Sequence, residues 1–398
     1  MSTLTPLKRN KPTTRELLAG VKVIDVDTHI TEWDDLWTSR APASLKDRVP
    51  QVRQVDGKRT WVIEGDTYLA QGSSSAIRSD GSKCTGMSFL DLRGLPEAHP
   101  GAYEVQARVA MMDQQGIFAQ VAYPNVLGFG GQAAMKIDAD LRVASTKIFN
   151  DAMAEFQADS SQRIYPMGLL PWWDVKLAVA EAERCSKMGL RGVNIASEPH
   201  AHGLPSLGSQ YWDPLWETCA GLNMPVNFHI GASDSSMSWY SKASWPERNP
   251  DEKLALGGVM MFIDNLQVMG NILMSRFLER HPGLKIVSVE SGAGWVPYLI
   301  EALEHMSRES NLEYKVPLLE IFRRQIYVCT FFERRNLVDT VHQVGVDNVM
   351  FETDYPHPAC LFPDGLDHVT DAVADLTAEE RFKIFSGNAA KVYNIDIR

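Results

Sequence analysis

Short apolar runs recur along the chain, separated by segments in which apolar residues return every three to four positions. The runs are VKVIDVDTHI (21–30), IFAQVAYPN (117–125), IYPMGLLPW (164–172), LRGVNIAS (190–197), PVNFHIGAS (225–233), LKIVSVESG (284–292), QIYVCTFF (325–332) and NVMFETD (348–354). Such runs are typical of buried parallel strands, and the longer period between them is typical of amphipathic helices. Eight alternations of strand and helix predict an α/β fold, a (β/α)8 TIM barrel.

Two stretches exceed what the predicted barrel needs. Residues 31–103 follow the first predicted strand and contain a predicted hairpin, RTWVIEGDTYLA; residues 234–256 follow the fifth predicted strand. Loops that leave the C-terminal ends of barrel strands build the active sites of this fold. We therefore expect insertions after strands one and five that cover a site, and we expect residues 234–256 to become ordered when a ligand binds.

The chain is expected to form one domain, because it contains no short internal repeat and no low-complexity linker. Its 398 residues suit an α/β barrel that carries insertions. Residues 1–20 are polar and are predicted to be an N-terminal arm, with the barrel spanning residues 21–398.

Composition narrows the class of partner. The net charge of −11 argues against nucleic acid and acidic membrane surfaces, and no apolar stretch approaches the roughly 20 residues of a membrane span. The five cysteines are odd in number, far apart and free of CxxC spacing, which favours reduced thiols over disulfides or a thiolate metal site. The prediction is a soluble, cytoplasmic protein with a small-molecule substrate and no nucleic-acid or membrane partner.

The ends of several predicted strands carry side chains that bind metals. The first strand reads DVDTHITE, and alternation places Asp25, Asp27 and His29 on one face, with Asp27 and His29 at the C-terminal end. Later strand ends and the loop after the last strand supply His229, Glu290, Asp354 and His357. Buried carboxylates are costly unless they are paired or bound to metal. Together these residues predict a divalent metal site at the rim of the barrel.

Two further carboxylates lie near the first strand end. Glu32 follows His29 by three residues and is either a ligand to the metal or substrate, or an exposed loop residue. Asp25 is deeper in the strand and is expected to orient a ligand by a hydrogen bond. For any one of these acids and histidines taken alone, a solvated strand end is an adequate explanation.

The order of motifs DVDTH, NFHIG, VSVESGAGWVPYLIEALEH and FETDYPHP resembles the amidohydrolase-related proteins. This branch of the amidohydrolase superfamily includes aminocarboxymuconate-semialdehyde decarboxylase and γ-resorcylate decarboxylase, and the resemblance extends from about residue 21 to the C-terminus. It implies a metal-dependent enzyme. In the family's motif Asp27 and His29 match the strand-one ligands, His229 the strand-five ligand and Asp354 the strand-eight carboxylate.

The sequence departs from the family at two places. Strand six of the decarboxylases ends in a histidine implied in proton transfer, whereas this chain has Glu290, and the strand-four lysine of binuclear hydrolases is missing from RGVNIAS. Glu290 and Asp354 are therefore the candidate catalytic groups. Glu290 either bridges two metals, with His357 and Glu32 completing the second site, or acts as the general base at a single metal.

Three functions follow from the resemblance and the residues. The first is a metal-dependent hydrolase or carboxy-lyase acting on a small carboxylated or amide-like molecule, with one or two Zn, Mn or Fe ions per chain. The second is an O2-activating dinuclear iron or manganese/iron hydroxylase component for a small amino acid, similar to 2-aminoisobutyrate hydroxylase. The third is a non-catalytic subunit of a hetero-oligomer. A homodimer or a hetero-oligomer with a related subunit is expected.

Overall fold

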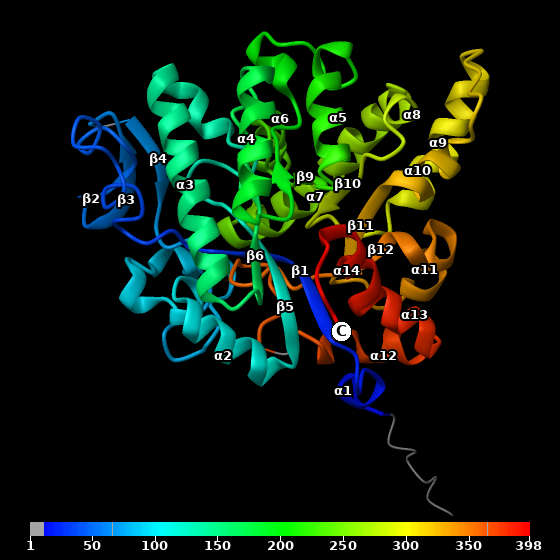
Figure 1. The fold of residues 1–398 in the computed structure, drawn as a ribbon. Coiled ribbons are helices and arrows are strands. Elements are labelled where there is room, and N and C mark those ends of the chain that lie inside the picture. Colours follow the sequence, from blue (N-terminus) through cyan, green and yellow to red (C-terminus); the bar gives the residue numbers. More distant parts are fainter. Residues whose placement is uncertain (1–11, 66, 364) are drawn as a thin grey trace, which may run out of the picture.

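The computed structural model describes residues 12–65, 67–363 and 365–398, and it confirms the predicted barrel (Figure 1). All eight predicted runs contain parallel strands, and one run is split by Met167 into two short strands. The barrel strands are β1 Val23–His29, β5 Ile117–Tyr123, β6 Ile164–Pro166 with β7 Gly168–Leu169, β8 Val193–Asn194, β9 Val226–His229, β10 Ile286–Val289, β11 Ile326–Thr330 and β12 Val349–Phe351.

The ring closes where the chain after β12 meets β1. Thr28 forms a parallel bridge with Tyr355, and the N–H of His29 donates to the Tyr355 carbonyl at 2.6 Å. The N–H of Asp354 donates to the Asp27 carbonyl at 2.8 Å. This closure brings the C-terminal ends of the first and last strands together, as the barrel fold requires.

Helices cover the outside of the ring (Figure 1). They are α2 Val105–Gln115, α3 Ala139–Asp159, α4 Val175–Met188, α5 Asp213–Gly221, α7 Pro250–Met274, α8 Phe277–Arg280, α9 Val296–Glu309, α10 Leu318–Gln325, α11 Leu337–Val344, α12 Thr370–Ala374, α13 Ala378–Phe382 and α14 Asn388–Tyr393. Helices α2 and α4 end at Gly116 and Gly189 in the left-handed conformation that glycine adopts without strain.

Alternate strand residues fill the inside of the ring. Val26 of β1, Val121 of β5 and Val289 of β10 belong to one buried cluster, which α14 joins through Tyr393. The Tyr393 hydroxyl donates to Asn227 Oδ1 at 2.8 Å, so the one polar group that α14 brings inside is satisfied. The end of the barrel at the N-termini of the strands is therefore a packed core. A site can lie only at the other end, where the C-termini of the strands meet.

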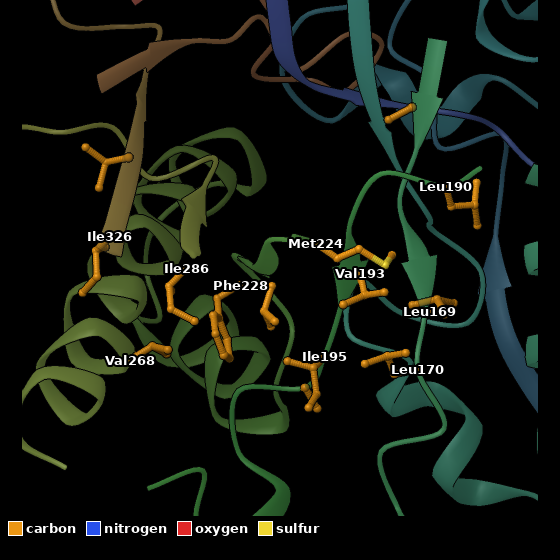
Figure 2. Packing of buried hydrophobic residues seen from close by; sticks show 14 of the residues in the cluster. Leu169, Leu170, Leu190, Val193, Ile195, Met224, Phe228, Val268, Ile286 and Ile326 are labelled. Atoms are coloured by element: carbon orange, nitrogen blue, oxygen red, sulfur yellow. The ribbon is translucent and has the colours of Figure 1, made fainter. Parts of the chain in front are cut away.

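The intervening strand residues form an outer apolar layer beneath the helices. Figure 2 shows Val193, Phe228, Ile286 and Ile326 of four successive strands in this layer, with Val268 of α7 packed beside them. Complete burial of one such side chain contributes about 1.5–3 kcal/mol. The strand period of two thus explains why these runs are apolar on both faces.

The first insertion contains a three-stranded antiparallel sheet. Its strands are β2 Gln51–Val55, β3 Lys58–Ile63 and β4 Thr67–Gln71, so the predicted hairpin is confirmed and β2 is added to it. Further along the insertion, the N–H of Ala76 donates to the Pro356 carbonyl at 2.7 Å, and Lys83 Nζ donates to the Cys360 carbonyl. The insertion therefore packs against the loop after β12.

The second insertion, residues 234–256, is mainly helical. Residues 234–242 form α6 (Asp234–Lys242), and α7 begins at Pro250. Asn249 caps α7 in a capping box with Glu252, and Pro250 occupies the first helical position, where its missing N–H is not needed. By length and composition alone α7 could span a membrane, but its apolar residues include those that pack on the barrel.

Part of the predicted N-terminal arm packs on the barrel. Helix α1 (Thr14–Leu17) begins with a capping box at Thr13, and Thr14 and Leu18 are buried. Residues 1–11 lie outside the described residues, so an arm over that stretch stays a prediction.

Candidate metal centre

Strand β1 contains one residue more than the part of β5 with which it pairs, and this changes the direction of the side chains that follow. Asp25 and Thr28 are three positions apart but pair with residues of β5 that are only two positions apart. This β-bulge turns the following side chains to the other face of the strand. Asp27 and His29 therefore both point into the barrel mouth, whereas Asp25 points away. The prediction that all three share a face by simple alternation is corrected.

Asp25 secures the end of the last barrel strand. Its Oδ1 accepts the N–H of Thr353 at 2.8 Å, and its Oδ2 accepts the Thr353 hydroxyl at 2.6 Å and the Gln120 amide at 2.9 Å. Burial raises the pKa of Asp25 to about 7. Because Thr353 precedes Asp354, Asp25 orients that residue through its backbone rather than by a bond to its side chain.

The imidazoles of His29 and His229 face one another. His29 Nδ1 lies 3.4 Å from the Pro124 carbonyl, and His229 Nδ1 lies 2.8 Å from the Ile230 carbonyl. Carbonyl oxygens only accept, so each Nδ1 carries the proton and each Nε2 presents a lone pair. The two Nε2 atoms are 3.1 Å apart, and Asp27 Oδ1 lies 3.7 and 3.6 Å from them.

Glu290 and Asp354 leave their strands in the left-handed backbone conformation, with φ of +60° and +59°. This conformation costs a non-glycine residue roughly 1–2 kcal/mol, and such strain gathers at functional sites. Glu290 Oε2 lies 3.3 Å from His229 Nε2, and Asp354 Oδ1 lies 3.6 Å from His29 Nε2. The strained turns bring both predicted catalytic carboxylates to the imidazoles.

His357 joins the cluster from the loop after β12. Its ring stacks on His29, with the two ring centroids 3.6 Å apart. Its Nδ1 lies 3.1 Å from Asp354 Oδ1, and its Nε2 lies 2.8 Å from Asn125 Oδ1.

The structure thus assembles six of the seven predicted metal ligands. They form two overlapping sets, in each of which the candidate ligand atoms lie within 4.8 Å of one another. The sets are Asp27, His29, His229 and Glu290, and His29, Glu290, Asp354 and His357.

The converging atoms present lone pairs to one another, an arrangement that a cation between them would satisfy. Both carboxylate oxygens of Asp27 and of Asp354 are buried without a hydrogen-bond partner, and the Nε2 atoms of His29 and His229 face each other. Unpaired buried carboxylates cost several kcal/mol. A divalent cation would be a partner to all these atoms, and oxygen and imidazole ligands without thiolate suit Mn, Fe or Zn.

Crowding shifts the ionisation of these groups. Burial and then the Asp354 and Asp27 carboxylates raise the pKa of Glu290 well above its ordinary value, and burial and then Asp27 do the same to Asp354. Burial and then the neighbouring imidazoles lower the pKa of His29 well below its ordinary value, and burial and then His229 lower the pKa of His357 to about 3. His29 and His357 are thereby held in the neutral form, which is the form of histidine that binds metals.

Glu32 does not join either ligand set, which corrects the prediction for this residue. It is buried rather than exposed, and its Oε1 accepts the N–H groups of Asn125 and Val126 at 2.8 and 3.0 Å. Its Oε2 lies 3.3 Å from Asn125 Nδ2. Glu32 therefore anchors the loop after β5.

Glu352 is a further buried carboxyl, and it lies outside both ligand sets. Its Oε2 accepts the N–H of Glu290 at 3.2 Å, while its Oε1 has no hydrogen-bond partner. Burial and then the charge of Asp27 raise its pKa well above the ordinary value. One feature of the sequence could have identified Glu352. It lies two residues before Asp354, and alternation along a strand places the side chains of both residues on the inward face.

Two cavities meet at the cluster. One, of about 450 Å³, is lined by Glu290, Asp354 and His357; the other, of about 360 Å³, shares His357 with it. Both volumes suit a small ligand. Most other walls of the larger cavity are apolar, among them Ile230, Leu254, Val259, Met261, Phe262 and Ala359. Among the described residues, neither cavity is lined by lysine or arginine.

Comparison with known proteins agrees with the fold and the motifs. A family model described as amidohydrolase matches residues 24–395. The γ-resorcylate decarboxylase of Polaromonas sp. is 28% identical over 325 residues, which cover 77% of this chain and 93% of that protein.

Two solved structures share the barrel. An amidohydrolase from Mycobacterium avium subsp. paratuberculosis has a TM-score of 0.75 at 24% identity, covering 94% of this chain and 99% of that one. The dihydroxybenzoic acid decarboxylase of Polaromonas sp., with bound manganese and the inhibitor 2-nitroresorcinol, has a TM-score of 0.61 at 19% identity, covering 94% and 97%.

The resemblance seen in the motifs is therefore confirmed. The family match begins within β1, ends two residues after α14 and includes every strand end that contributes to the cluster. The chain belongs to the amidohydrolase family.

Proposed function

We propose that this protein is a metal-dependent decarboxylase of a small aromatic carboxylic acid. The observation that carries the proposal is a cluster of acceptor-only ligand atoms that opens on a mainly apolar cavity. The apolar walls suit an aromatic ring. Because the described lining residues include no lysine or arginine, recognition of the carboxylate falls to the metal. The similarity to γ-resorcylate decarboxylase supports this substrate class.

The metal would be held by Asp27, His29, His229 and Asp354, the positions that match the family's ligands. Manganese is the favoured ion, because the Polaromonas dihydroxybenzoic acid decarboxylase binds it. A bound divalent cation would fix the substrate carboxylate and offset the negative charge of the site.

Glu290 is placed to handle the proton of this reaction. Decarboxylation breaks the bond between the ring carbon and the carboxylate carbon, releases CO2 and leaves an electron pair on the ring carbon, which must take up a proton. Glu290 lines the cavity, so its carboxyl could deliver a proton to that carbon. It would perform with a carboxyl group the task implied for a histidine in the decarboxylases.

The test is turnover of aromatic acids by manganese-loaded protein. We expect CO2 release from at least one member of a panel that includes 2,6-dihydroxybenzoate and 5-carboxyvanillate, and no release after chelation. In D2O the product should carry one deuterium at the carbon that lost the carboxylate, because the proton comes from solvent through Glu290. Fully metallated protein that is inert on the whole panel would contradict the proposal.

A dinuclear centre is the second candidate, and one observation favours it. The two ligand sets share His29 and Glu290, but His29 has one free nitrogen whereas Glu290 has two oxygens. Glu290 could therefore bridge two metals, with His357 in the second site. Two metals would favour hydrolysis or O2 activation over decarboxylation. O2 uptake in the presence of a reductant distinguishes the oxygenase.

Residues 234–256, which form α6 and the first part of α7, are proposed to act as a lid. Tyr240 of α6 lines the smaller cavity, and Leu254 of α7 lines the larger one. We expect trypsin to cut after Lys242 or Arg248, and cutting to slow several-fold when manganese and 2-nitroresorcinol are bound. Lys315, exposed on a distant loop, is the control site. Equal cutting at the α6–α7 connection with and without ligand would count against a lid.

We also propose a soluble, cytoplasmic enzyme without nucleic-acid or membrane partners. All five cysteines are free and buried, which fits a reducing compartment. Exposed apolar side chains on and between α6 and α7 support the predicted homodimer or hetero-oligomer, since such patches mark interfaces. They are Met237, Trp239, Trp245, Leu256, Val259 and Ile263.

A further inference from the structure

Asn125 connects Glu32 to the metal cluster. The residue follows β5, and its side chain lies between the buried Glu32 carboxylate and the His357 ring. Its Nδ2 donates to the Ile30 carbonyl at 2.8 Å and lies 3.3 Å from Glu32 Oε2. Its Oδ1 lies 2.8 Å from His357 Nε2.

The surroundings permit only one orientation of the Asn125 amide. Its Nδ2 faces two groups that only accept, the Ile30 carbonyl and the Glu32 carboxylate, so reversing the amide would place an oxygen against two oxygens. Glu32 is itself fixed, because its other oxygen accepts two backbone N–H groups. The oxygen of Asn125 must therefore face His357.

This orientation determines which nitrogen of His357 carries the proton. An amide oxygen only accepts, so Nε2 of His357 donates and its Nδ1 presents a lone pair. That lone pair faces Asp354 Oδ1 at 3.1 Å, within the second ligand set. Stacking on His29 fixes the plane of the ring as well.

We propose that Asn125, held by Glu32, is a positioning residue that fixes His357 in its Nε2–H tautomer and so keeps its Nδ1 available to a metal ion. The inference rests on the metal site of the proposed function. Partners that orient a metal-binding histidine typically change metal affinity 10–100-fold. In this proposal the buried Glu32 acts on the metal site indirectly, by holding Asn125 in place.

Three variants separate hydrogen bonding from packing. Asn125→Leu keeps the volume but cannot accept from His357. Glu32→Gln places an amide N–H against Asn125 Nδ2, which favours a reversed amide and hence the other tautomer of His357. The double variant Asn125→Asp with Glu32→Gln restores an oxygen towards His357 and a donor–acceptor pair with residue 32, at unchanged net charge. It leaves a carboxylate oxygen against the Ile30 carbonyl, so the restoration is partial.

A second buried asparagine provides the matched control. Asn150 donates to the Leu169 carbonyl at 2.9 Å and to Glu181 Oε1 at 2.6 Å, and both Asn150 and Glu181 are buried. Neither belongs to a ligand set or lines either cavity. Asn150→Leu therefore removes the same kind of asparagine–glutamate contact with no expected effect on metal binding.

The measurements are the 15N spectrum of ring-labelled histidines in metal-free protein and Mn²⁺ affinity by competition with a chelator. The His357 signals are assigned by their loss in His357→Gln. We expect a protonated Nε2 in the wild type and mixed tautomers in Asn125→Leu and Glu32→Gln. Mn²⁺ affinity should fall about 10–100-fold in both and recover in part in the double variant.

Two outcomes would overturn the inference: an unchanged His357 tautomer in both single variants, or a Mn²⁺ affinity within about twofold of Asn150→Leu, well below the range expected for an orienting partner. A wild-type protein that binds no divalent metal would instead contradict the proposed function. The tautomer comparison in metal-free protein would still decide the role of Asn125.

Discussion

His229→Ala is expected to fold normally and to lose nearly all of its bound metal. The Nε2 of His229 is central to the first ligand set, since it lies 3.1 Å from His29 Nε2, 3.3 Å from Glu290 Oε2 and 3.6 Å from Asp27 Oδ1. Removing it leaves a gap that the remaining acceptors cannot close. Metal catalysis contributes several kcal/mol, so activity should fall at least about 100-fold.

Elemental analysis of protein purified without added metal checks this prediction, with circular dichroism to establish folding. His342→Ala is the control, because His342 is exposed, pairs with Glu380 Oε1 at 2.7 Å and belongs to neither ligand set. It should keep the wild-type metal content. Undiminished metal in folded His229→Ala would refute the assignment.

Glu290→Gln is expected to keep the fold and to lose activity. If Glu290 supplies or removes the proton at a single metal, kcat should fall about 10²–10⁴-fold, because an amide cannot perform acid–base catalysis. Asp264→Asn is the matched control. Burial raises the pKa of that carboxyl to about 6, but it lies outside both ligand sets, so its loss should leave kcat near that of the wild type.

Counting metals separates the two roles of Glu290. Close to two metals per chain in the wild type, falling to about one in Glu290→Ala, would support a bridge between two ions about 3.5–4 Å apart. One metal in both proteins, with activity lost in the variant, would leave Glu290 as the acid–base group. A Glu290→Ala protein with full metal content and full activity would exclude both roles.

The sequence by itself determined the barrel and most of its site. Eight apolar runs with helical segments between them can form few compact folds. Parallel strands that are apolar on both faces must form a sheet that closes into a barrel or that is covered by helices on both faces. The fold then brings the C-terminal strand ends together, so His229, Glu290 and Asp354 could be grouped without any contact being known. The hairpin over 59–70 was likewise readable from its alternation.

The sequence analysis predicted an insertion over residues 234–256 but not its secondary structure. The structure shows that Ser233 and Asn249 cap two helices there. Propensity alone does not decide between a loop and a short helix in such a segment.

Only the tertiary structure decided which acids lie in the candidate metal centre. A bulge in β1 separates Asp27 from Asp25, and a bulge depends on how two strands pair rather than on one strand's pattern. Glu32 follows the same strand, but the N–H groups that bind it come from residues about 90 positions later in the chain. Pattern along a chain determines which face a residue occupies; the partners that fix its role come from other strands, and only folding brings them within hydrogen-bond distance.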